Sequence, residues 1–154
     1  MPPAPDFYAL SQQIKHWGQE LGFQQVGICN TDLAEAETYL NAWLAQDYHG
    51  EMSYMSRHGT KRSRPDELVG GTLRIISLRM NYWPSAEFAI DALLDAPDRA
   101  YIARYALGRD YHKLLRQRLR ALALRIETQV GSFGYRVFVD SAPVLERAIA
   151  EKSG

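Results

Sequence analysis

Apolar side chains recur along the N-terminal part of the chain at the spacing of three and four residues that marks an amphipathic helix. Gly22 follows this repeat and is a candidate for the residue that ends the helix. Residues 23–29 then form a short apolar run, which we interpret as the first strand. Cys29 in this run is either a buried small apolar residue or a nucleophile, and its setting favours burial. The helical repeat consists of Phe7, Leu10, Ile14, Trp17 and Leu21.

A second amphipathic helix is predicted to follow, with Thr31 or Asp32 as its N-cap. The pattern then changes, because residues 47–64 have no clean period but are dense in aromatic side chains, methionine, histidine and arginine. Sites often form in loops of this kind. His49 and His58 lie nine residues apart, which is not the spacing of a helical pair of metal ligands, and we predict no metal site. The apolar face of the second helix consists of Leu33, Ala36, Leu40, Trp43 and Leu44.

Residues 73–82 form the clearest predicted strand, since their nearly continuous apolar run is typical of a central strand covered on both faces. The segment after it is weakly patterned and contains two prolines, which indicates a loop with a short helix at 89–94. From residue 101 the chain is predicted to continue as a strand, turn at Gly108 and enter its longest helix. The buried stripe of that helix consists of Leu115, Leu119, Leu122, Ile126 and Val130.

The stretch 135–147 combines an alternating strand pattern with the start of a helix. Asp140 falls where the predicted strand, 135–139, stops. Ser141 can cap the following helix, which carries Pro143 in its first turn. The local pattern favours a capping role alone for Asp140 or Ser141. The alternative is that Asp140 is a carboxylate placed for chemistry at the end of a strand, beside the positive end of a helix.

The predicted order of elements is α-β-α-loop-β-loop-β-α-β-α. This order indicates an α/β protein, in the form of an α+β sandwich with helices packed on a mixed central sheet. A length of 154 residues fits one domain that spans 1–154. The sequence has no G-x-G-x-x-G or P-loop motif after a strand and no G-x-S-x-G motif, which argues against a Rossmann site, a P-loop and a hydrolase elbow.

The composition is that of an ordinary globular protein, with 46% apolar and 23% charged residues. A single cysteine excludes a disulfide within this chain and an all-cysteine metal site. The sequence shows neither an apolar run long enough to span a bilayer nor the pattern of a secretory signal. We therefore expect a cytoplasmic protein without a membrane contact.

Positive charge is concentrated although the formal net charge is zero. Between Arg99 and Arg125 there are eight basic residues, and Asp110 is the one acidic residue among them. Such clusters either contact an anionic partner, a phosphate group or a nucleic acid, or form a solvated helix face. A second basic cluster consists of Arg57, Lys61, Arg62 and Arg64.

Three stretches, 48–55, 104–113 and 138–147, together closely resemble the N-terminal part of the epoxyqueuosine reductase family. The resemblance extends over essentially the whole chain and includes residues 20–28 and 74–82. This family carries out the last step of queuosine synthesis, on the wobble base of certain tRNA anticodons. The motifs are individually weak, but all of them occur in order and at the spacing of the family.

The resemblance implies a cobalamin-dependent reductase that removes the epoxide oxygen from the cyclopentane ring of epoxyqueuosine. It also implies a fold akin to other cobalamin-binding reductase domains. The family's proton donor matches Asp140, which suits a reaction that develops negative charge on oxygen. Because an ordinary aspartate is ionised at neutral pH, this role requires burial that raises its pKa. The cobalamin contacts of the family match Arg57, Arg104 and Asp140, and we add their neighbours Tyr105, Ser141 and Arg147.

The chain ends where the family would continue into a ferredoxin-like domain that holds two [4Fe–4S] clusters on cysteines. We therefore expect an incomplete catalytic fragment that is inactive alone, with iron–sulfur clusters only in the missing C-terminal domain. The expected partners are the tRNA anticodon stem-loop that carries epoxyqueuosine and an electron donor acting through the iron–sulfur domain, and the fragment itself is expected to be a monomer. Two alternatives remain open: a stand-alone, non-catalytic module that binds cobalamin or tRNA, and a plain RNA-binding domain that uses the basic helix.

Overall fold

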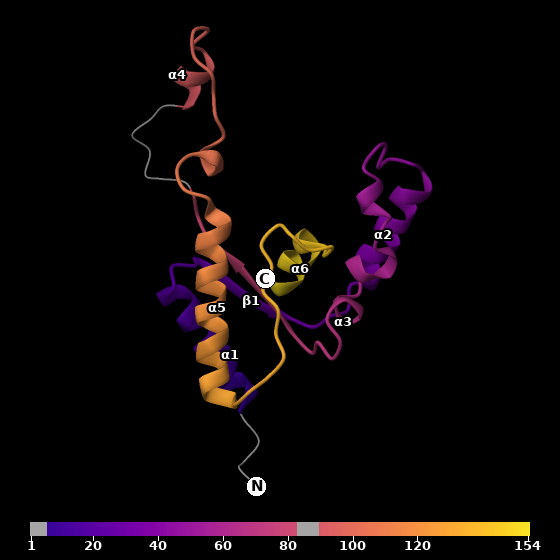
Figure 1. The fold of residues 1–154 in the computed structure, drawn as a ribbon, viewed down its shortest axis with the longest axis vertical. Coiled ribbons are helices and arrows are strands. Elements are labelled where there is room, and N and C mark those ends of the chain that lie inside the picture. The colour runs from indigo at the N-terminus through magenta and orange to yellow at the C-terminus, as the bar shows by residue number, and fades with distance from the viewer. Residues whose placement is uncertain (1–5, 83–89) are drawn as a thin grey trace.

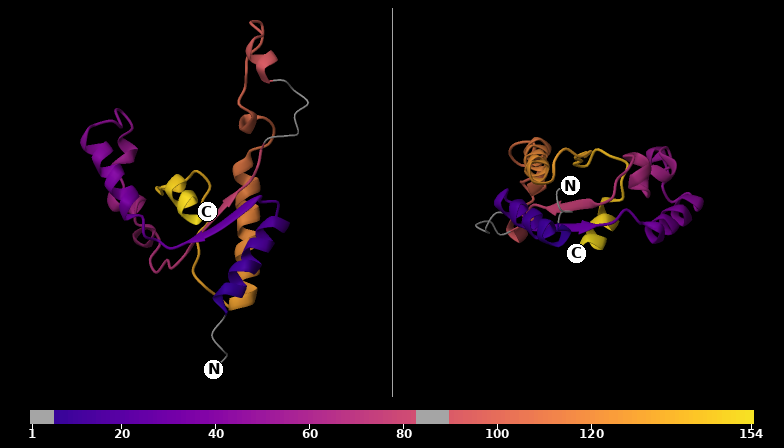
Figure 2. Two further views of the ribbon diagram at one scale, coloured as in Figure 1. Left: turned by 180° about the vertical axis from the view of Figure 1, so that it is seen from behind. Right: turned by 90° about the horizontal axis from the view of Figure 1, so that it is seen from below.

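The computed structural model of the protein describes residues 6–82 and 90–154. Apart from α4 (Ile90–Leu94) and the short 3-10 helix η3 (Arg104–Ala106), its helices and strands form two parts that diverge from a small sheet (Figure 1). The first part, which we call the body, has α1 and α5 side by side and consists of α1 (Phe7–Glu20), β1 (Gln25–Cys29), β2 (Ile75–Arg79), α5 (Tyr111–Val130) and α6 (Glu146–Ser153). The second part, which we call the arm, covers residues 34–68 and carries α2 and α3. The view from below in Figure 2 places α5 and the arm toward opposite ends of the two strands.

The sheet consists of β1 (Gln25–Cys29) and β2 (Ile75–Arg79), which pair in antiparallel fashion with Gln25 opposite Arg79 and Cys29 opposite Ile75. These are its two strands in the described part of the chain. The α+β class is therefore confirmed, but the sheet is antiparallel and smaller than the mixed sheet that we expected.

The apolar character of β2 has a different cause from the central position that we predicted. Val26 and Leu78, which are partners in the register, face the apolar cluster built on α1 and α5. Cys29 and Ile75 face the opposite side, where α6 (Glu146–Ser153) packs. Helices on both faces, rather than strands on both edges, explain the continuous apolar run.

The two long helices of the body begin and end close to their predicted positions. The first, α1 (Phe7–Glu20), is capped by Asp6, which accepts the N–H groups of Tyr8 and Ala9 at 2.9 and 3.0 Å. Gly22 follows it with a φ of 87°, a value that glycine adopts without strain. The second, α5 (Tyr111–Val130), begins after Asp110. The buried residues Ile14, Leu122 and Ile126 join these two helices in one apolar cluster.

Two predicted strands do not form, and one predicted helix begins later than expected. Residues 135–139 run outside any strand, and the segment before α5 contains the short 3-10 helix η3 (Arg104–Ala106) instead of a strand. A strand needs a neighbour for its N–H and C=O groups, and among the described residues neither segment has one. The helix expected from Ser141 begins at Glu146, so Ser141 is not its cap.

The arm has little apolar core of its own. Its main helix, α2 (Ala34–Ala45), has no buried residue, and Asp32 accepts the N–H of Ala34 at 3.1 Å although Leu33 occupies the N-cap position. The irregular segment folds into η1 (Ser53–Met55) and η2 (Gly59–Arg62), followed by α3 (Pro65–Leu68). The predicted short helix near residue 90 is α4 (Ile90–Leu94), and Ala89 lies outside the described residues.

Candidate functional site

Asp140 lies where the extended segment 132–139 ends, and its backbone adopts a left-handed conformation with φ of 51°. Aspartate is among the few residues other than glycine that are found in this region. The turn directs the chain from the extended segment toward α6. The Asp140 side chain is 49% exposed, so the described residues do not provide the burial that its predicted role as an acid requires.

Two side chains from the first turn of α5 meet the carboxyl group of Asp140. Tyr111 donates its hydroxyl hydrogen to Oδ2, and His112 places its Nε2 3.6 Å from the same oxygen. The rings of Tyr111 and His112 are stacked, with centroids 4.1 Å apart. The Asp140 hydrogen bond raises the pKa of Tyr111 to about 12. Tyr111 therefore stays protonated as a hydrogen-bond donor over the whole physiological range.

Asp110 fixes the orientation of the His112 ring from the other side. Its Oδ1 accepts the backbone N–H of His112 at 3.0 Å and lies 2.8 Å from Nδ1 of the same residue. The pKa of Asp110 is lowered, chiefly by the hydrogen bond from the His112 side chain. A carboxylate at this position accepts a hydrogen from Nδ1, which leaves Nε2 directed at Asp140.

Glu146, the first residue of α6, brings a second carboxyl group to Asp140. Burial of this carboxyl group is the largest cause that raises the pKa of Glu146, and the negative charge of Asp140 raises it further. The backbone N–H of Asp140 acts in the opposite direction as a hydrogen-bond donor. Although Glu146 as a residue is exposed, its carboxyl group lies against Asp140, where packing withdraws it from water. Two neighbouring carboxyl groups favour a state in which they share a proton.

An aromatic pocket adjoins the carboxyl cluster on the side of Tyr111. Tyr105 stands edge-on to both Tyr82 and Tyr111, with centroid distances of 6.3 and 6.4 Å. Met80 and Leu115 complete the lining of a pocket of about 310 Å³. This volume is within the lower range of small-molecule sites. Asp140 therefore lies next to a pocket with apolar walls and phenol groups, joined to it through Tyr111.

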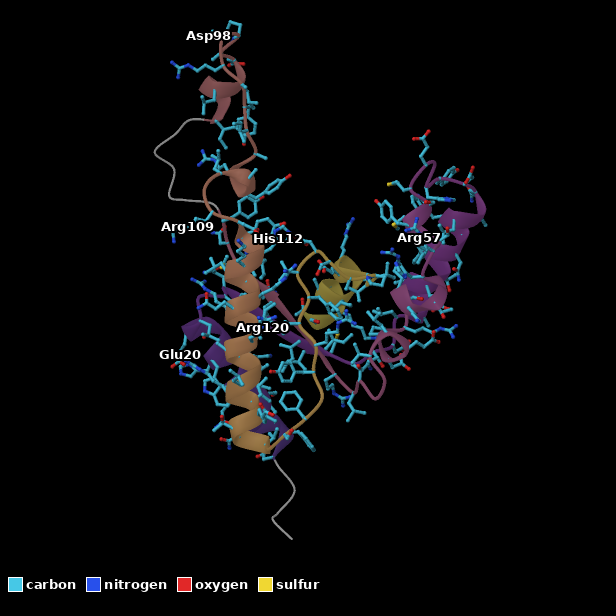
Figure 3. All side chains as sticks on the ribbon, viewed as in Figure 1. Glu20, Arg57, Asp98, Arg109, His112 and Arg120 are labelled. Carbon is cyan, nitrogen blue, oxygen red and sulfur yellow. The ribbon has the colours of Figure 1, made fainter. Side chains whose placement is uncertain are left out.

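The predicted cofactor residues are spread over several elements. Arg57 lies on the arm between η1 and η2, across the molecule from His112 (Figure 3). Arg104 and Tyr105 belong to η3, and Tyr105 contacts the Asp140 cluster through Tyr111. Ser141 directly follows Asp140, and Arg147 occupies the first turn of α6, with both residues exposed. Of the predicted set, Ser141 is thus next to Asp140 in the chain and Tyr105 contacts Tyr111 of the Asp140 cluster, whereas Arg57 lies away from both.

Sequence reasoning missed the three residues that contact Asp140, namely Tyr111, His112 and Glu146, and it also missed Asp110, which holds His112. The signal was present, because a helix N-cap followed at once by Tyr and His places two polar rings on the first turn of α5. Only the fold shows that this turn lies beside Asp140. In residues 6–82 and 90–154, no group of three or more His, Cys, Asp or Glu side chains is arranged to hold a metal ion, and no helix has the length and apolar character needed to span a membrane.

Known proteins similar to this chain share one description. A family model for "Epoxyqueuosine reductase QueG, DUF1730" matches residues 62–141. The epoxyqueuosine reductase of Pseudomonas aeruginosa is 61% identical over 150 residues, which cover 97% of this chain and 41% of the relative. The Escherichia coli epoxyqueuosine reductase is 58% identical over 149 residues, which cover 97% of this chain and 39% of the relative. The chain thus spans about two-fifths of the length of these relatives.

Solved structures of the same description have a similar fold. The structure of epoxyqueuosine reductase from Streptococcus thermophilus matches with a TM-score of 0.70 at 21% identity and covers 94% of this chain and 38% of its own. An epoxyqueuosine reductase crystallised with an epoxyqueuosine-modified tRNA-Tyr stem loop matches with a TM-score of 0.74 at 22% identity and covers 97% and 39%. At this identity the likeness concerns the fold alone.

Proposed function

Because this chain belongs to the epoxyqueuosine reductase family, we propose that it is the N-terminal, cobalamin-binding part of an enzyme that reduces epoxyqueuosine to queuosine in tRNA anticodons. In this proposal residues 1–154 form one domain of a longer enzyme. The electrons reach it from a domain with [4Fe–4S] clusters outside this chain, and the chain alone does not turn over. The observation that carries the proposal is the position of Asp140 in a hydrogen-bonded cluster beside an aromatic pocket.

Asp140 acts as the proton donor in this proposal. Opening an epoxide develops negative charge on its oxygen, which a positioned carboxylic acid neutralises by transferring its proton. The exposed half of the Asp140 side chain faces outward from the described residues. Bound substrate and the rest of the enzyme would cover this side and exclude water. That desolvation favours the protonated carboxyl group that the reaction needs.

The arginine side chains predicted to bind the cofactor suit a large ligand with many amide groups. Arg57 lies between η1 and η2, Arg104 lies in η3 and Arg147 lies in α6, and the amide fringe of a corrin extends in several directions. A guanidinium offers several fixed donors to such amides and to the phosphate of the cofactor. Tyr105 and Ser141 would contact the cofactor beside Asp140. When bound, reduced cobalamin would supply the electrons for the reduction.

The basic helix α5 is the proposed contact for tRNA phosphate groups. A solved relative is bound to an epoxyqueuosine-modified tRNA stem loop. Along α5, Arg125 pairs with Glu20 and Arg118 donates to Met80 Sδ, so these two arginines have contacts within the chain. Lys113 and Arg120 are exposed on the same helix. Cationic groups of this kind bind nucleic acid through phosphate, with strong salt dependence.

The test uses a hybrid protein in which this chain is followed by the remaining residues of the Pseudomonas aeruginosa relative. Incubation with cobalamin, a low-potential reductant and an epoxyqueuosine-containing stem loop is expected to yield queuosine, detected by mass spectrometry after nuclease digestion. The unextended chain is the matched control and is expected to give none. Formation of queuosine by the unextended chain would contradict the proposal that the chain needs a separate iron–sulfur domain for turnover. A hybrid that binds cobalamin but forms no queuosine would favour the non-catalytic module.

A further inference from the structure

The chemistry of the proposed reaction requires more protons than one carboxyl group carries. Removing an epoxide oxygen as water breaks two C–O bonds, forms one C=C bond, and consumes two electrons and two protons. A reduced corrinoid would provide the electrons, in line with the proposed function on which this inference rests. Asp140 can deliver one proton from its carboxyl group and must then be protonated again. The structure should therefore contain a route that brings a second proton to Asp140.

His112 is placed to provide that route. Its Nε2 lies 3.6 Å from Asp140 Oδ2, and Asp110 holds Nδ1 on the opposite edge of the ring at 2.8 Å. The His112 side chain is 36% exposed, so it is in contact with solvent as well as with Asp140. Among the described residues no other histidine pairs with Asp140. We propose that His112 is a proton shuttle that transfers protons from solvent to Asp140 during the reduction.

The transfer is a balanced exchange of one proton. The Nε2–H bond of the imidazolium breaks, an O–H bond forms on Asp140, and the neutral imidazole takes up a new proton from water or buffer. A separation of 3.6 Å exceeds a direct hydrogen bond. A small movement of the ring or one bridging water closes it, as is common for catalytic groups without their substrate. Tyr111 supports the geometry, because its ring stacks on His112 while its hydroxyl holds Oδ2 of Asp140.

The charged and titratable groups around the proposed shuttle come from three elements. Asp110 faces His112 from the N-cap of α5, and Lys113 from the following position acts on Asp110. Asp140 faces it from the turn, and Glu146 lies behind Asp140 at the start of α6. Tyr111 is the remaining titratable neighbour and stays protonated. Glu146 therefore needs its own control in any experiment that follows the protonation of Asp140.

The first experiment uses the chain itself, with the side-chain carboxyl carbons of aspartate labelled for NMR. The chemical shift of the Asp140 carboxyl carbon, followed against pH, is expected to contain an inflection that reports protonation of His112, because Nε2 of His112 lies 3.6 Å from Oδ2 of Asp140. His112→Gln is expected to remove one inflection, and Glu146→Gln is expected to leave the His112-dependent one in place. Identical Asp140 curves in the wild-type chain and in His112→Gln would overturn the proposal.

The second experiment measures queuosine formation by the hybrid protein. His112→Ala is expected to lower the rate by about tenfold or more, since positioned acid–base groups contribute roughly 10²–10⁴-fold. Added imidazole is expected to restore the rate of queuosine formation in His112→Ala but not in Asp140→Asn. His16→Ala, on the exposed face of α1, is the matched control and is expected to retain the wild-type rate.

The outcomes separate this inference from the proposed function. An unchanged rate in His112→Ala, or a loss that imidazole does not restore, would overturn the shuttle while leaving the proposed function intact. An inactive wild-type hybrid would count against the proposed function, and the NMR titration would then decide whether protonation of His112 is sensed at Asp140, which the shuttle requires.

Discussion

The body and the arm are held together by different forces. In the body, apolar clusters lie on both faces of the sheet and include the nearly inaccessible Leu122. In the arm, α2 has no buried residue, and its position depends on Glu37, which accepts two hydrogen bonds from Arg64 at 2.8 and 3.0 Å. Ser63, only 2% exposed, donates to the same carboxylate at 2.6 Å.

This difference assigns separate roles to the two parts. The body positions the Asp140 cluster through apolar packing, because α5 and α6, which carry the residues around Asp140, pack on opposite faces of the sheet. The arm presents Arg57 on a polar framework whose strength depends on pH. Arg62 connects the two parts, since its backbone C=O accepts the N–H of Leu145 at 3.2 Å and its guanidinium donates to the Tyr54 carbonyl at 3.0 Å.

Truncation of Leu122 is expected to have the largest effect, because this side chain lies at the centre of the α1–α5 cluster. Leu122→Ala should lower the free energy of unfolding by about 2–5 kcal/mol, the range for a large apolar residue cut to alanine in a core. Urea unfolding followed by circular dichroism measures this change. Leu124→Ala on the same helix is the matched control, because Leu124 is 55% exposed. Equal effects of the two substitutions would contradict the proposed apolar support.

A methyl group at Gly27 is expected to have the next largest effect. A Cβ at this position would lie 2.5 Å from both the Cβ and the carbonyl oxygen of Ser153, so α6 would have to move away from β1. Gly27→Ala should cost about 1–3 kcal/mol, as overpacking commonly does. Gly70→Ala, with open space around it, is the control. A Gly27→Ala protein as stable as wild type would show that α6 is not held against the strand.

Acid is expected to loosen the arm before the body. Hydrogen bonds from Arg64, the largest cause, lower the pKa of Glu37 from 4.5 to about 2. A lowered pKa contributes stability that is complete above pH 4.5 and is lost as the pH falls toward 2. Hydrogen exchange should therefore accelerate in residues 59–68 over this range, while α5 remains protected. Glu37→Gln should show fast exchange in these residues at neutral pH, whereas the control Glu35→Gln should not. Equal acceleration of exchange in the arm and in the body at low pH would be evidence against the polar framework.

The smallest expected effect is spectroscopic and concerns the Asp140 cluster. Tyr111 has a pKa raised to about 12, chiefly by its hydrogen bond to Asp140. A raised pKa contributes stability that is present below pH 10 and is lost as the pH rises toward 12. The difference in absorbance at the tyrosinate band between wild type and Tyr111→Phe should titrate near 12. When Asp140 is replaced by Asn in both proteins, the midpoint of this absorbance difference should move closer to pH 10. An unchanged midpoint would mean that the hydrogen bond between Tyr111 and Asp140 is absent.

The sequence predicts the local parts of this structure better than its tertiary contacts. The helical repeat places α1 and α5 correctly, because a stripe such as Ile14 and Trp17 depends only on nearby residues. The alternation at 135–139 predicts a strand that does not form, since the pattern cannot show whether a neighbouring strand exists. The family resemblance indicates Asp140, but the contact with His112 arises from the packing of α5 against a distant turn. Single-residue patterns do not report such contacts.

In the proposed function, Asp140 is the acid of an epoxyqueuosine reductase. The most direct measurement is queuosine formation in an epoxyqueuosine-containing stem loop by the hybrid protein, with Asp140 or with Asn in its place. The wild-type hybrid should form queuosine, and Asp140→Asn should lower the rate by at least about a hundredfold, because asparagine keeps the shape but has no acidic proton to transfer. Full activity of Asp140→Asn would contradict the claim.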